Sequence, residues 1–399
     1  MNASLYIHVP FCAGGKCDYC DFYSIPLKDG DPRPEHFVEK ILSEAERLFE
    51  TFKPASIPTL YIGGGTPSIL GTAGIRRLLL GLSERTARFS IAVPAEITVE
   101  ANPESADEAF LAAAHEGGAT RLSLGIQTFH GPSRRAVHRL GSELHSDETL
   151  LSSRLALAAQ YFPGSFSADL ITGLPFQDER VLLDDIAALL DYRPAHVSLY
   201  ALTVEPGTPL AVSLTAAKKA AAILLPPQDV ADRLWLSGRD ALEKAGYNQY
   251  EVSNFCQSGK ESRHNIRYWR MQNWLALGPA ASGTIIDDET GTGFRYTIPR
   301  DVDAWLTGKI LEPFFEELDP LTLIKETFLM GFRYIEGPDE ELFRRRFRRD
   351  IPELIPKTVD TWQDRGLLRK DKMAFTGEGL LFLDRFLIEA FGELDSSSS

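Results

Sequence analysis

The sequence predicts an α/β protein built around a partial parallel (β/α)6 barrel, followed by an additional α+β segment and a small C-terminal helical domain of winged-helix-like pattern. Two observations support this fold class. Up to about residue 212, short runs of β-branched or aromatic residues alternate with longer amphipathic runs, so the hydrophobic period changes repeatedly between strand and helix values. Repeated βα units form parallel sheets covered by helices, and six units are too few for a closed eight-stranded barrel.

The expected elements of the barrel follow one another in alternation. Strands are predicted at 5–9, 59–62, 97–100, 121–126, 167–171 and 196–200. Helices are predicted between them at 35–52, 74–88, 106–116, 146–161 and 179–190. Together these segments form a first domain, residues 1–212.

Two further domains are expected after the barrel. Residues 213–314 form a connector and an α+β extension, with a helix at 229–245, a strand at 247–252 and a loop rather than a regular element at 253–284. Residues 315–395 form the C-terminal domain, which is rich in helix and includes a hairpin at 366–375. The last four residues, 396–399, are expected to be a disordered tail.

Composition limits the functions that the chain can have. A formal net charge of −14, from 56 acidic and 42 basic residues, argues against a protein whose whole surface binds nucleic acid. No apolar stretch reaches the roughly 18 to 20 residues of a membrane span, so we do not expect an integral membrane protein. The N-terminus lacks a basic segment and leaves no room for a signal peptide before its cysteines. We therefore expect a cytoplasmic location.

Unusual residues stand at the ends of the predicted strands. Cysteines follow the first strand and a Gly63–Pro67 turn follows the second, while Glu100 ends the third. Gln127 follows the fourth strand and Asp169 lies in the fifth. In parallel α/β barrels, ligands bind beyond the C-terminal ends of the strands. The sequence therefore predicts that these residues line one mouth.

Three of the four cysteines, Cys12, Cys17 and Cys20, lie within nine positions. Three thiolates can hold three irons of a 4Fe-4S cluster and leave the fourth iron open for a substrate or cofactor. A zinc site with His8 as the fourth ligand is an alternative, as are a Cys17-x-x-Cys20 redox pair and simple buried thiols. The spacing alone leaves these readings open. The isolated Cys256 is expected to be a small buried hydrophobe.

Six motifs together resemble those of radical S-adenosylmethionine (SAM) proteins in the subgroup around oxygen-independent coproporphyrinogen III oxidase. They lie in order over most of the chain, at residues 6–22, 61–68, 100–103, 122–129, 169–175 and 198–208. The resemblance implies a radical-SAM barrel with a 4Fe-4S cluster held by the three clustered cysteines. It also implies that SAM contacts Tyr6, Tyr19, Gly64, Gly65, Thr66, Glu100, Gln127, Arg139 and Asp169.

Two features resemble the haem-chaperone branch of this subgroup. The oxidases carry a further cysteine two positions after the third cluster cysteine, where this chain has Phe22. The chaperone branch carries an His-Asn-x-x-Tyr-Trp motif, which residues 264–269 match. The resemblance implies a chaperone that transfers haem to haem-accepting proteins, with membrane-bound respiratory enzymes among the candidates, and it does not identify an electron donor. Haem contacts are implied for His264, Asn265, Tyr268 and Trp269.

The chain departs from the family pattern at two places. Four residues rather than three separate Cys12 from Cys17, and the adjacent glycines 14 and 15 are expected to let the extra residue bulge outward. An Arg that follows a Leu-Gly pair in the family is absent at 140–142, and Arg139 is expected to replace it. Two other functions stay open: an oxygen-independent coproporphyrinogen III oxidase-type enzyme of porphyrin biosynthesis, and a zinc-stabilised binding protein without SAM chemistry.

Overall fold

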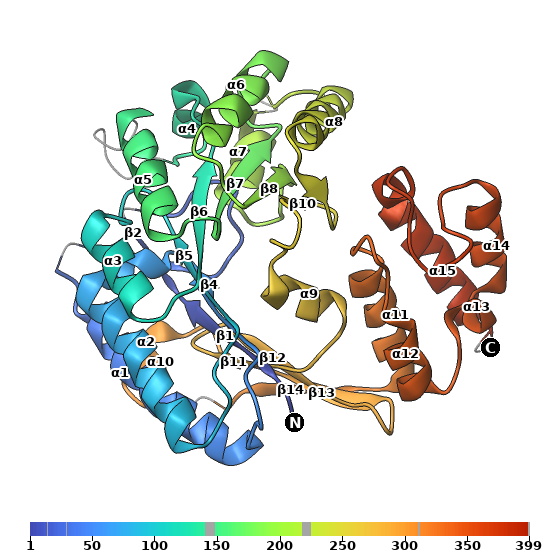
Figure 1. Ribbon diagram of the computed structural model, residues 1–399, viewed down its shortest axis with the longest axis horizontal. Helices are drawn as coiled ribbons and strands as arrows, with labels where there is room; N and C mark the ends of the chain where they lie inside the picture. The colour runs from blue at the N-terminus through green and yellow to red at the C-terminus, as the bar shows by residue number, and fades with distance from the viewer. Residues whose placement is uncertain (14, 29, 140–147, 218–224, 310–311, 398–399) are drawn as a thin grey trace.

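The computed structural model describes residues 1–13, 15–28, 30–139, 148–217, 225–309 and 312–397. Within them, one twelve-stranded sheet runs in the order β14-β13-β12-β11-β1-β4-β5-β6-β7-β8-β10-β9. Six adjacent parallel strands form its centre, and the sheet curves so that helices cover its outer side (Figure 1). These strands are β1 (Ser4–Val9), β4 (Thr59–Gly64), β5 (Glu96–Ala101), β6 (Arg121–Gln127), β7 (Phe166–Thr172) and β8 (His196–Ala201). The predicted α/β class is confirmed.

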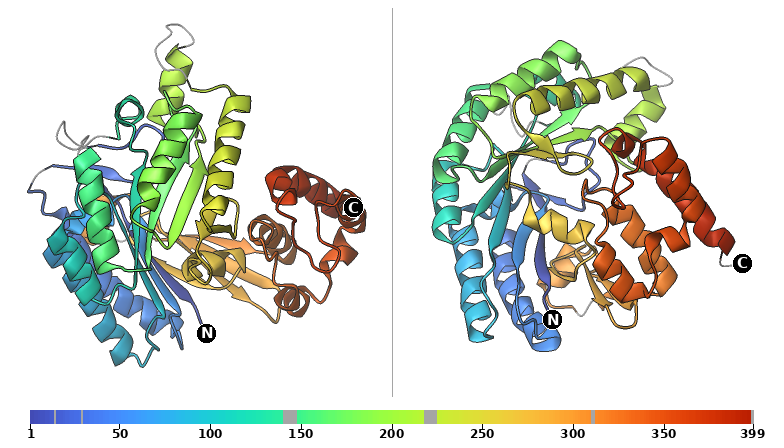
Figure 2. Two further views of the ribbon diagram at one scale, coloured as in Figure 1. Left: turned by 45° about the horizontal axis from the view of Figure 1, so that its top comes forward. Right: turned by 45° about the vertical axis from the view of Figure 1, so that its right-hand side comes forward.

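The connecting helices lie where the sequence predicts them, apart from residues 146 and 147, which are outside the described part of the chain. They are α1 (Arg33–Phe52), α2 (Gly71–Arg88), α3 (Glu108–Glu116), α5 (Glu148–Tyr161) and α6 (Glu179–Leu190). Two more helices were not predicted, α4 (Gly131–Ala136) and α7 (Pro209–Ala217). The helix predicted at 229–245 is α8 (Gln228–Lys244). Figure 2 shows α1, α2, α3, α5, α6 and α8 along the outside of the sheet.

Side chains alternate along the parallel strands between two environments. Apolar residues such as Leu5, Ile62 and Leu122 belong to the main core that packs against the helices. The residues between them are mostly polar and face one another on the inner side of the curved sheet, which we call the lumen. Lumen contacts include Ser4 with Thr59 and Ser167 with His196. The lumen-facing residues also include Tyr6, His8, Tyr61, Thr98, Glu100, Arg121, Ser123, Asp169 and Ser198.

The expectation of a loop at 253–284 was wrong, because this segment contains regular elements. They are β10 (Asn254–Cys256), α9 (Arg263–Trp269), β11 (Trp274–Leu277) and the start of β12 (Ser282–Asp287). β11 pairs in parallel with β1, and β12, β13 (Thr292–Thr297) and β14 (Phe314–Leu318) extend the same sheet in antiparallel order. The predicted strand at 247–252 is reduced to β9 (Asn248–Gln249).

A contact distant in sequence explains why α9 is a helix. The Ser262 side chain accepts a hydrogen bond from Asn265 N, which is an ordinary N-cap. The carboxylate of Glu96, at the start of β5, accepts hydrogen bonds from the backbone N–H groups of Arg263 and His264 at 3.0 and 2.9 Å. These N–H groups have no partner within the helix, so a residue 168 positions away satisfies them.

The C-terminal residues form a second hydrophobic core, which includes Phe332 and Trp362. Its helices are α11 (Pro320–Gly331), α12 (Glu340–Phe347), α13 (Ile351–Leu354), α14 (Pro356–Asp364) and α15 (Leu383–Ser397). The helical prediction is confirmed, whereas the hairpin is a single bridge between Leu368 and Phe375. The tail prediction was wrong for residues 396 and 397, which continue α15.

One arginine ties the C-terminal core to the large sheet. Arg346 of α12 is 4% exposed and donates hydrogen bonds to the Met271 carbonyl at 3.0 Å and to Asp288 at 2.7 Å. Asp288 lies in the turn between β12 and β13. No helix in the described part of the chain is long and apolar enough to cross a membrane.

Candidate functional site

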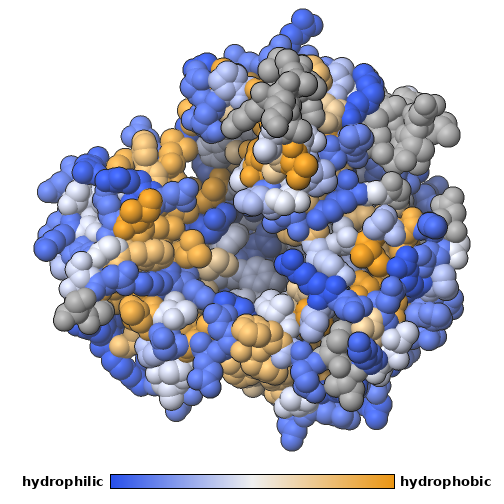
Figure 3. All heavy atoms as spheres, turned by 180° about the vertical axis from the view of Figure 1, so that it is seen from behind, coloured by the Kyte–Doolittle hydropathy of each residue, from blue (hydrophilic) through white to orange (hydrophobic). Residues whose placement is uncertain are grey.

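The two ends of the lumen differ. At the N-terminal ends of the strands, α9 closes the lumen: His264 Nδ1 lies 2.8 Å from Thr59 Oγ1, and Glu96 holds the start of the helix. At the C-terminal ends lies the mouth, where the cysteine segment and the loops after the other strands gather. Figure 1 shows α9 in front of the sheet, and the opposite face in Figure 3 has a deep central hollow.

Asp18 anchors the cysteine segment at the mouth. Its backbone N donates to the Val137 carbonyl at 3.0 Å, and its carboxylate lies 2.7 Å from His138 Nδ1. Its own carbonyl accepts a hydrogen bond from Leu210 N at 2.9 Å. The segment is therefore held by the loop after β6 and by α7, two elements far from it in sequence.

Arg139 reaches the cysteine segment. Its Nη1 lies 3.6 Å from Cys17 Sγ, and its Nη2 donates to the Gly125 carbonyl at 2.5 Å and to Asn102 Oδ1 at 3.2 Å. Tyr19 is partly buried, and its hydroxyl lies within hydrogen-bond reach of the same thiol. The departure from the family pattern at 140–142 lies outside the described residues, but the guanidinium of Arg139 is in place beside the thiol of Cys17.

The glycine turn after β4 packs directly on the first cysteine strand, β2 (Phe11–Ala13). A Cβ on Gly65 would lie 2.4 Å from the Phe11 carbonyl oxygen, and one on Gly64 would lie 2.6 Å from His8 Nδ1. Gly64 also has a φ of +115°, which favours glycine. Thr66 Oγ1 lies 3.7 Å from Cys12 Sγ, so the turn and the cysteine belong to one site.

Asn102 joins the two halves of this site and was not assigned a role from the sequence. Its side chain donates to Thr66 Oγ1 at 3.1 Å and accepts from Arg139. The sequence did contain a signal for this residue, because Asn102 lies in the motif at 100–103. A motif identifies neighbours in sequence, however, and not which of them bridges two loops.

Glu100 is held at the inner side of the glycine turn. Tyr61 OH donates to one carboxylate oxygen at 2.6 Å, and Gly64 N donates to the other at 3.1 Å. Burial raises the pKa of Glu100 to about 7, although the Tyr61 hydrogen bond opposes this shift. Its carboxyl is therefore partly protonated at neutral pH.

The remaining SAM candidates face the mouth or the part of the lumen next to it. Gln127 ends β6 with a φ of +68°, beside an irregularity in the β6–β7 pairing. Burial raises the pKa of Asp169, while a hydrogen bond with Ser198 opposes the shift. Tyr6 OH lies 2.9 Å from His8 Nδ1. The structure thus brings these candidates to the same end of the sheet as the cysteines.

The arrangement of the three clustered cysteines fits an iron-sulfur cluster better than a single metal ion. Among the described residues, no group of three or more His, Cys, Asp or Glu side chains is close enough to hold one ion. In a 4Fe-4S cluster each thiolate binds a different iron, so its sulfurs need not share one ion. His8, the candidate fourth zinc ligand, uses Nδ1 for Tyr6 and Nε2 for the Tyr23 carbonyl at 2.8 Å.

The extra residue between Cys12 and Cys17 is compatible with this set. Gly14 lies outside the described residues. Gly15 has a φ of +137° and no atom within 4 Å of where a Cβ would stand, so this turn faces open space. Burial raises the pKa of Cys20 to about 11, so binding iron there displaces a proton.

The four haem candidates lie on α9, away from the cysteines. His264 is 1% exposed, and its Nδ1 and Nε2 lie 2.8 and 2.9 Å from Thr59 Oγ1 and Tyr268 OH. Burial lowers the pKa of His264 to about 3, so the imidazole is neutral. Trp269 Nε1 is buried and has no hydrogen-bond partner among the described residues, and Arg333 lies over its ring. Asn265 takes part through its backbone N–H, which bonds Ser262.

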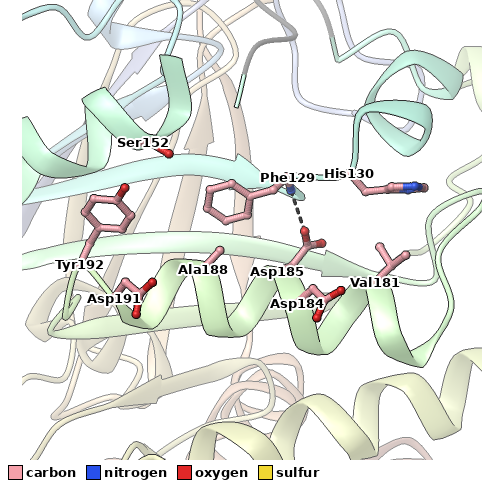
Figure 4. Close-up of a pocket in the computed structure, with 9 residues that line it drawn as sticks. All are labelled: Phe129, His130, Ser152, Val181, Asp184, Asp185, Ala188, Asp191 and Tyr192. Carbon is pink, nitrogen blue, oxygen red and sulfur yellow. Dashed lines mark hydrogen bonds between the residues drawn. The ribbon is translucent and has the colours of Figure 1, made fainter. Parts of the chain in front are cut away.

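A separate pocket of about 360 Å³ lies on the outer side of the sheet, between α5 and α6 (Figure 4). Asp185 in its wall accepts hydrogen bonds from Thr128 Oγ1 at 2.5 Å and Phe129 N at 2.8 Å. This carboxylate fixes the loop that follows Gln127. None of the predicted cysteine, SAM or haem residues lines the pocket.

Known proteins that resemble this chain agree with the fold and the site described above. The family model of the radical SAM superfamily matches residues 6–189. A solved structure of Escherichia coli coproporphyrinogen III oxidase (HemN), a radical SAM enzyme, has a TM-score of 0.78 over 97% of this chain and 89% of that one, at 20% identity. At this identity the likeness establishes the fold, that of a radical SAM protein.

Similar sequences narrow the class to one family. The heme chaperone HemW of Mycobacterium tuberculosis is 35% identical over 95% of this chain and 92% of its own length. HemW of Escherichia coli is 31% identical over 96% of this chain and 97% of its own length. The mouse mitochondrial radical S-adenosyl methionine domain-containing protein 1 is 31% identical over 99% of this chain and 89% of its own length. The chain belongs to the radical-SAM haem chaperone family, whose cofactors are a 4Fe-4S cluster and SAM.

The cysteines give the first test. Anaerobic reconstitution of the full chain with iron and sulfide should give a brown protein with a reducible cluster signal in electron paramagnetic resonance. We expect Cys12→Ala, Cys17→Ala and Cys20→Ala each to abolish that signal, because each thiolate holds one iron. Cys256→Ala is the matched control, since this buried thiol on β10 lies outside the mouth. A colourless product with one bound zinc would contradict the cluster assignment.

Glu100 gives a test that needs no cofactor. Because burial raises its pKa from 4.5 to about 7, the folded state binds more protons than the unfolded state in this window. Its contribution to stability is therefore complete below pH 4.5 and is lost as the pH rises through 7. Urea unfolding should show a smaller pH-dependent loss of stability for Glu100→Gln than for wild type. Glu84→Gln, on the exposed face of α2, should retain the wild-type slope; equal slopes in all three proteins would refute the assignment.

Proposed function

We propose that this protein is a cytoplasmic haem chaperone, which binds haem beside its cluster and SAM and transfers it to haem-accepting proteins. Membrane-bound respiratory enzymes are the proposed recipients. The names of its relatives supply the class of cargo. In this role the cluster and SAM sites belong to a carrier, and no catalytic residue is assigned.

The observation that carries this proposal is Phe22. It stands two positions after Cys20, where the oxidase branch is expected to have a cysteine, and it is 61% exposed. A side chain at this point lies beside the cluster ligands, so its chemistry affects what the mouth accepts. A phenyl ring cannot ligate a metal or donate a proton, but it offers an apolar surface to a porphyrin.

Other exposed apolar side chains follow the strand ends and support a porphyrin-binding mouth. Phe176 lies between β7 and α6 and is 61% exposed, while Tyr200 at the end of β8 is 42% exposed. Val204 and Val212 follow β8 and are also exposed. We call these four residues and Phe22 the apolar rim. Exposed apolar groups gathered at a site are typical of a surface that a ligand covers.

An oxidase of the coproporphyrinogen III type is the second candidate, because the overall fold is compatible with it. The structure of HemN covers nearly the whole chain, so the fold alone does not separate a chaperone from an oxidase. The two functions differ in what they do to a tetrapyrrole: a chaperone returns it unchanged, and the oxidase reading requires its oxidative decarboxylation.

Parallel assays on the reconstituted protein test the choice. We expect haemin to bind at about one equivalent with a saturable Soret band, because a carrier must hold its cargo. We expect no conversion of coproporphyrinogen III to protoporphyrinogen IX in the presence of SAM and a reductant. Conversion at enzymatic turnover would overturn the chaperone proposal, and so would the absence of saturable haemin binding.

The role of α9 in haem binding is tested separately. Both ring nitrogens of His264 are hydrogen-bonded, one to Thr59 and the other to Tyr268. His264 can therefore ligate iron only if one of these hydrogen bonds breaks. If it does so, His264→Ala should shift the Soret band and weaken haemin binding at least tenfold, while a control, His115→Ala on α3, leaves both unchanged. An unchanged titration in His264→Ala would reject His264 as the ligand.

A further inference from the structure

Arg134 of α4 is a fully buried arginine that binds the backbone. Its side chain has no exposed surface, and its Nη2 lies 3.4 Å from Glu104 Oε1. Its Nη1 donates hydrogen bonds to the Ile126 carbonyl at 3.0 Å and to the Thr128 carbonyl at 3.3 Å. A buried charge is costly unless it is paired and hydrogen-bonded, and these contacts supply its partners. The two carbonyls stand on either side of Gln127, which is one of the SAM candidates.

Gln127 has a backbone conformation that a glutamine rarely adopts. Its φ is +68°, and Thr128 N donates to the Ile126 carbonyl at 3.0 Å, which closes a three-residue γ-turn around it. A γ-turn with a positive φ is rare and strained, so contacts elsewhere must hold it. In an extended strand the carbonyls of residues 126 and 128 would lie about 6.6 Å apart, too far for one nitrogen to bond both. The two bonds from Arg134 Nη1 therefore stabilise the turn against the extended strand.

The Gln127 side chain points from this turn toward the mouth. A Cβ built on Gly125 would lie 3.0 Å from Gln127 Nε2. The same position lies 3.0 Å from Arg139 Nη2 and 3.3 Å from Asn102 Oδ1. The Gln127 amide therefore lies beside the two side chains that connect the cysteine segment to the glycine turn. It makes no side-chain hydrogen bond with a residue that the structure describes, so it is free to bind a ligand there.

The backbone of Arg134 is joined to a second SAM candidate. Its carbonyl accepts a hydrogen bond from Arg139 N at 2.9 Å, so one residue contacts the segments that carry both candidates. On the outer side of the sheet, Asp185 accepts hydrogen bonds from Thr128 Oγ1 and Phe129 N. The turn is therefore held from two sides, and Arg134 supplies the bonds to its two carbonyls.

We propose that Arg134 is a positioning residue for SAM. It holds the γ-turn in the form that points Gln127 at the cofactor, and it acts through Gln127 rather than by contact with SAM. A planar guanidinium suits this task because its N–H groups bond several oxygens at fixed angles. The inference rests on the proposed function only for its SAM site, in which Gln127 is a predicted contact, and not for haem transfer.

A double-mutant cycle on SAM affinity tests the proposal. SAM is titrated into the reconstituted protein without a reductant, so that it binds without being cleaved. Gln127→Ala should weaken binding about tenfold, as for the loss of one or two hydrogen bonds. Arg134→Met should weaken it about five- to tenfold in wild type. In the Gln127→Ala background the same change should cost less than about twofold, because Arg134 then has no side chain to position.

Matched variants separate positioning from general damage. Arg135→Met changes the neighbouring arginine of α4, which is exposed, and should leave SAM affinity unchanged. Arg134→Lys keeps a positive charge beside Glu104 but loses the planar fork, so it should weaken SAM binding only about threefold. Iron content and thermal unfolding show whether each variant folds and holds its cluster. If Arg134→Met does not fold, the cycle is run with Arg134→Lys.

The outcomes are distinct. An equal loss of SAM affinity in the wild-type and Gln127→Ala backgrounds would show that Arg134 acts through general stability or charge, and would overturn the proposal. An unchanged SAM affinity in Gln127→Ala would also overturn it, because Gln127 would then not contact SAM. Haemin titration of the same samples tests the proposed function separately: if wild type binds SAM but not haemin, the haem chaperone is rejected while the SAM cycle still decides on Arg134.

Discussion

The alternation of side chains along the six parallel strands determines the rest of the structure. Every second residue faces the helices and is apolar, and this set builds the main core. The residues between them face the lumen and are polar, whereas closed parallel barrels usually fill their interior with branched apolar side chains. A polar interior is stable only if its groups find partners, and the paired contacts across the lumen supply most of them.

This constraint also explains why the candidate cofactor residues from five of the six motifs lie near one another. The strands are parallel and in register, so their C-terminal ends lie at one edge, and the segments that follow them contact each other there. Arg139 and Asn102 then connect the cysteine segment to the glycine turn. The site is therefore assembled from loops, but its geometry depends on the strands beneath them.

Local patterns were sufficient to predict the six strands, their helices and the residues at the strand ends, because hydrophobic period and turn residues act within a few positions. They were insufficient for α9, whose first turn is capped by Glu96, and for β11, whose partner is β1. Both depend on contacts between segments far apart in the chain.

The pairing of β1 with β11 has a consequence for the order of events during synthesis. The strand that precedes the three cysteines is made long before residues 274–277, so one of its two edges stays open until they are translated. A nascent chain shorter than this exposes an unpaired parallel edge beside three free thiols. Such long-range pairing forms late. The cysteine segment is thus translated well before the strand that completes the sheet beside it.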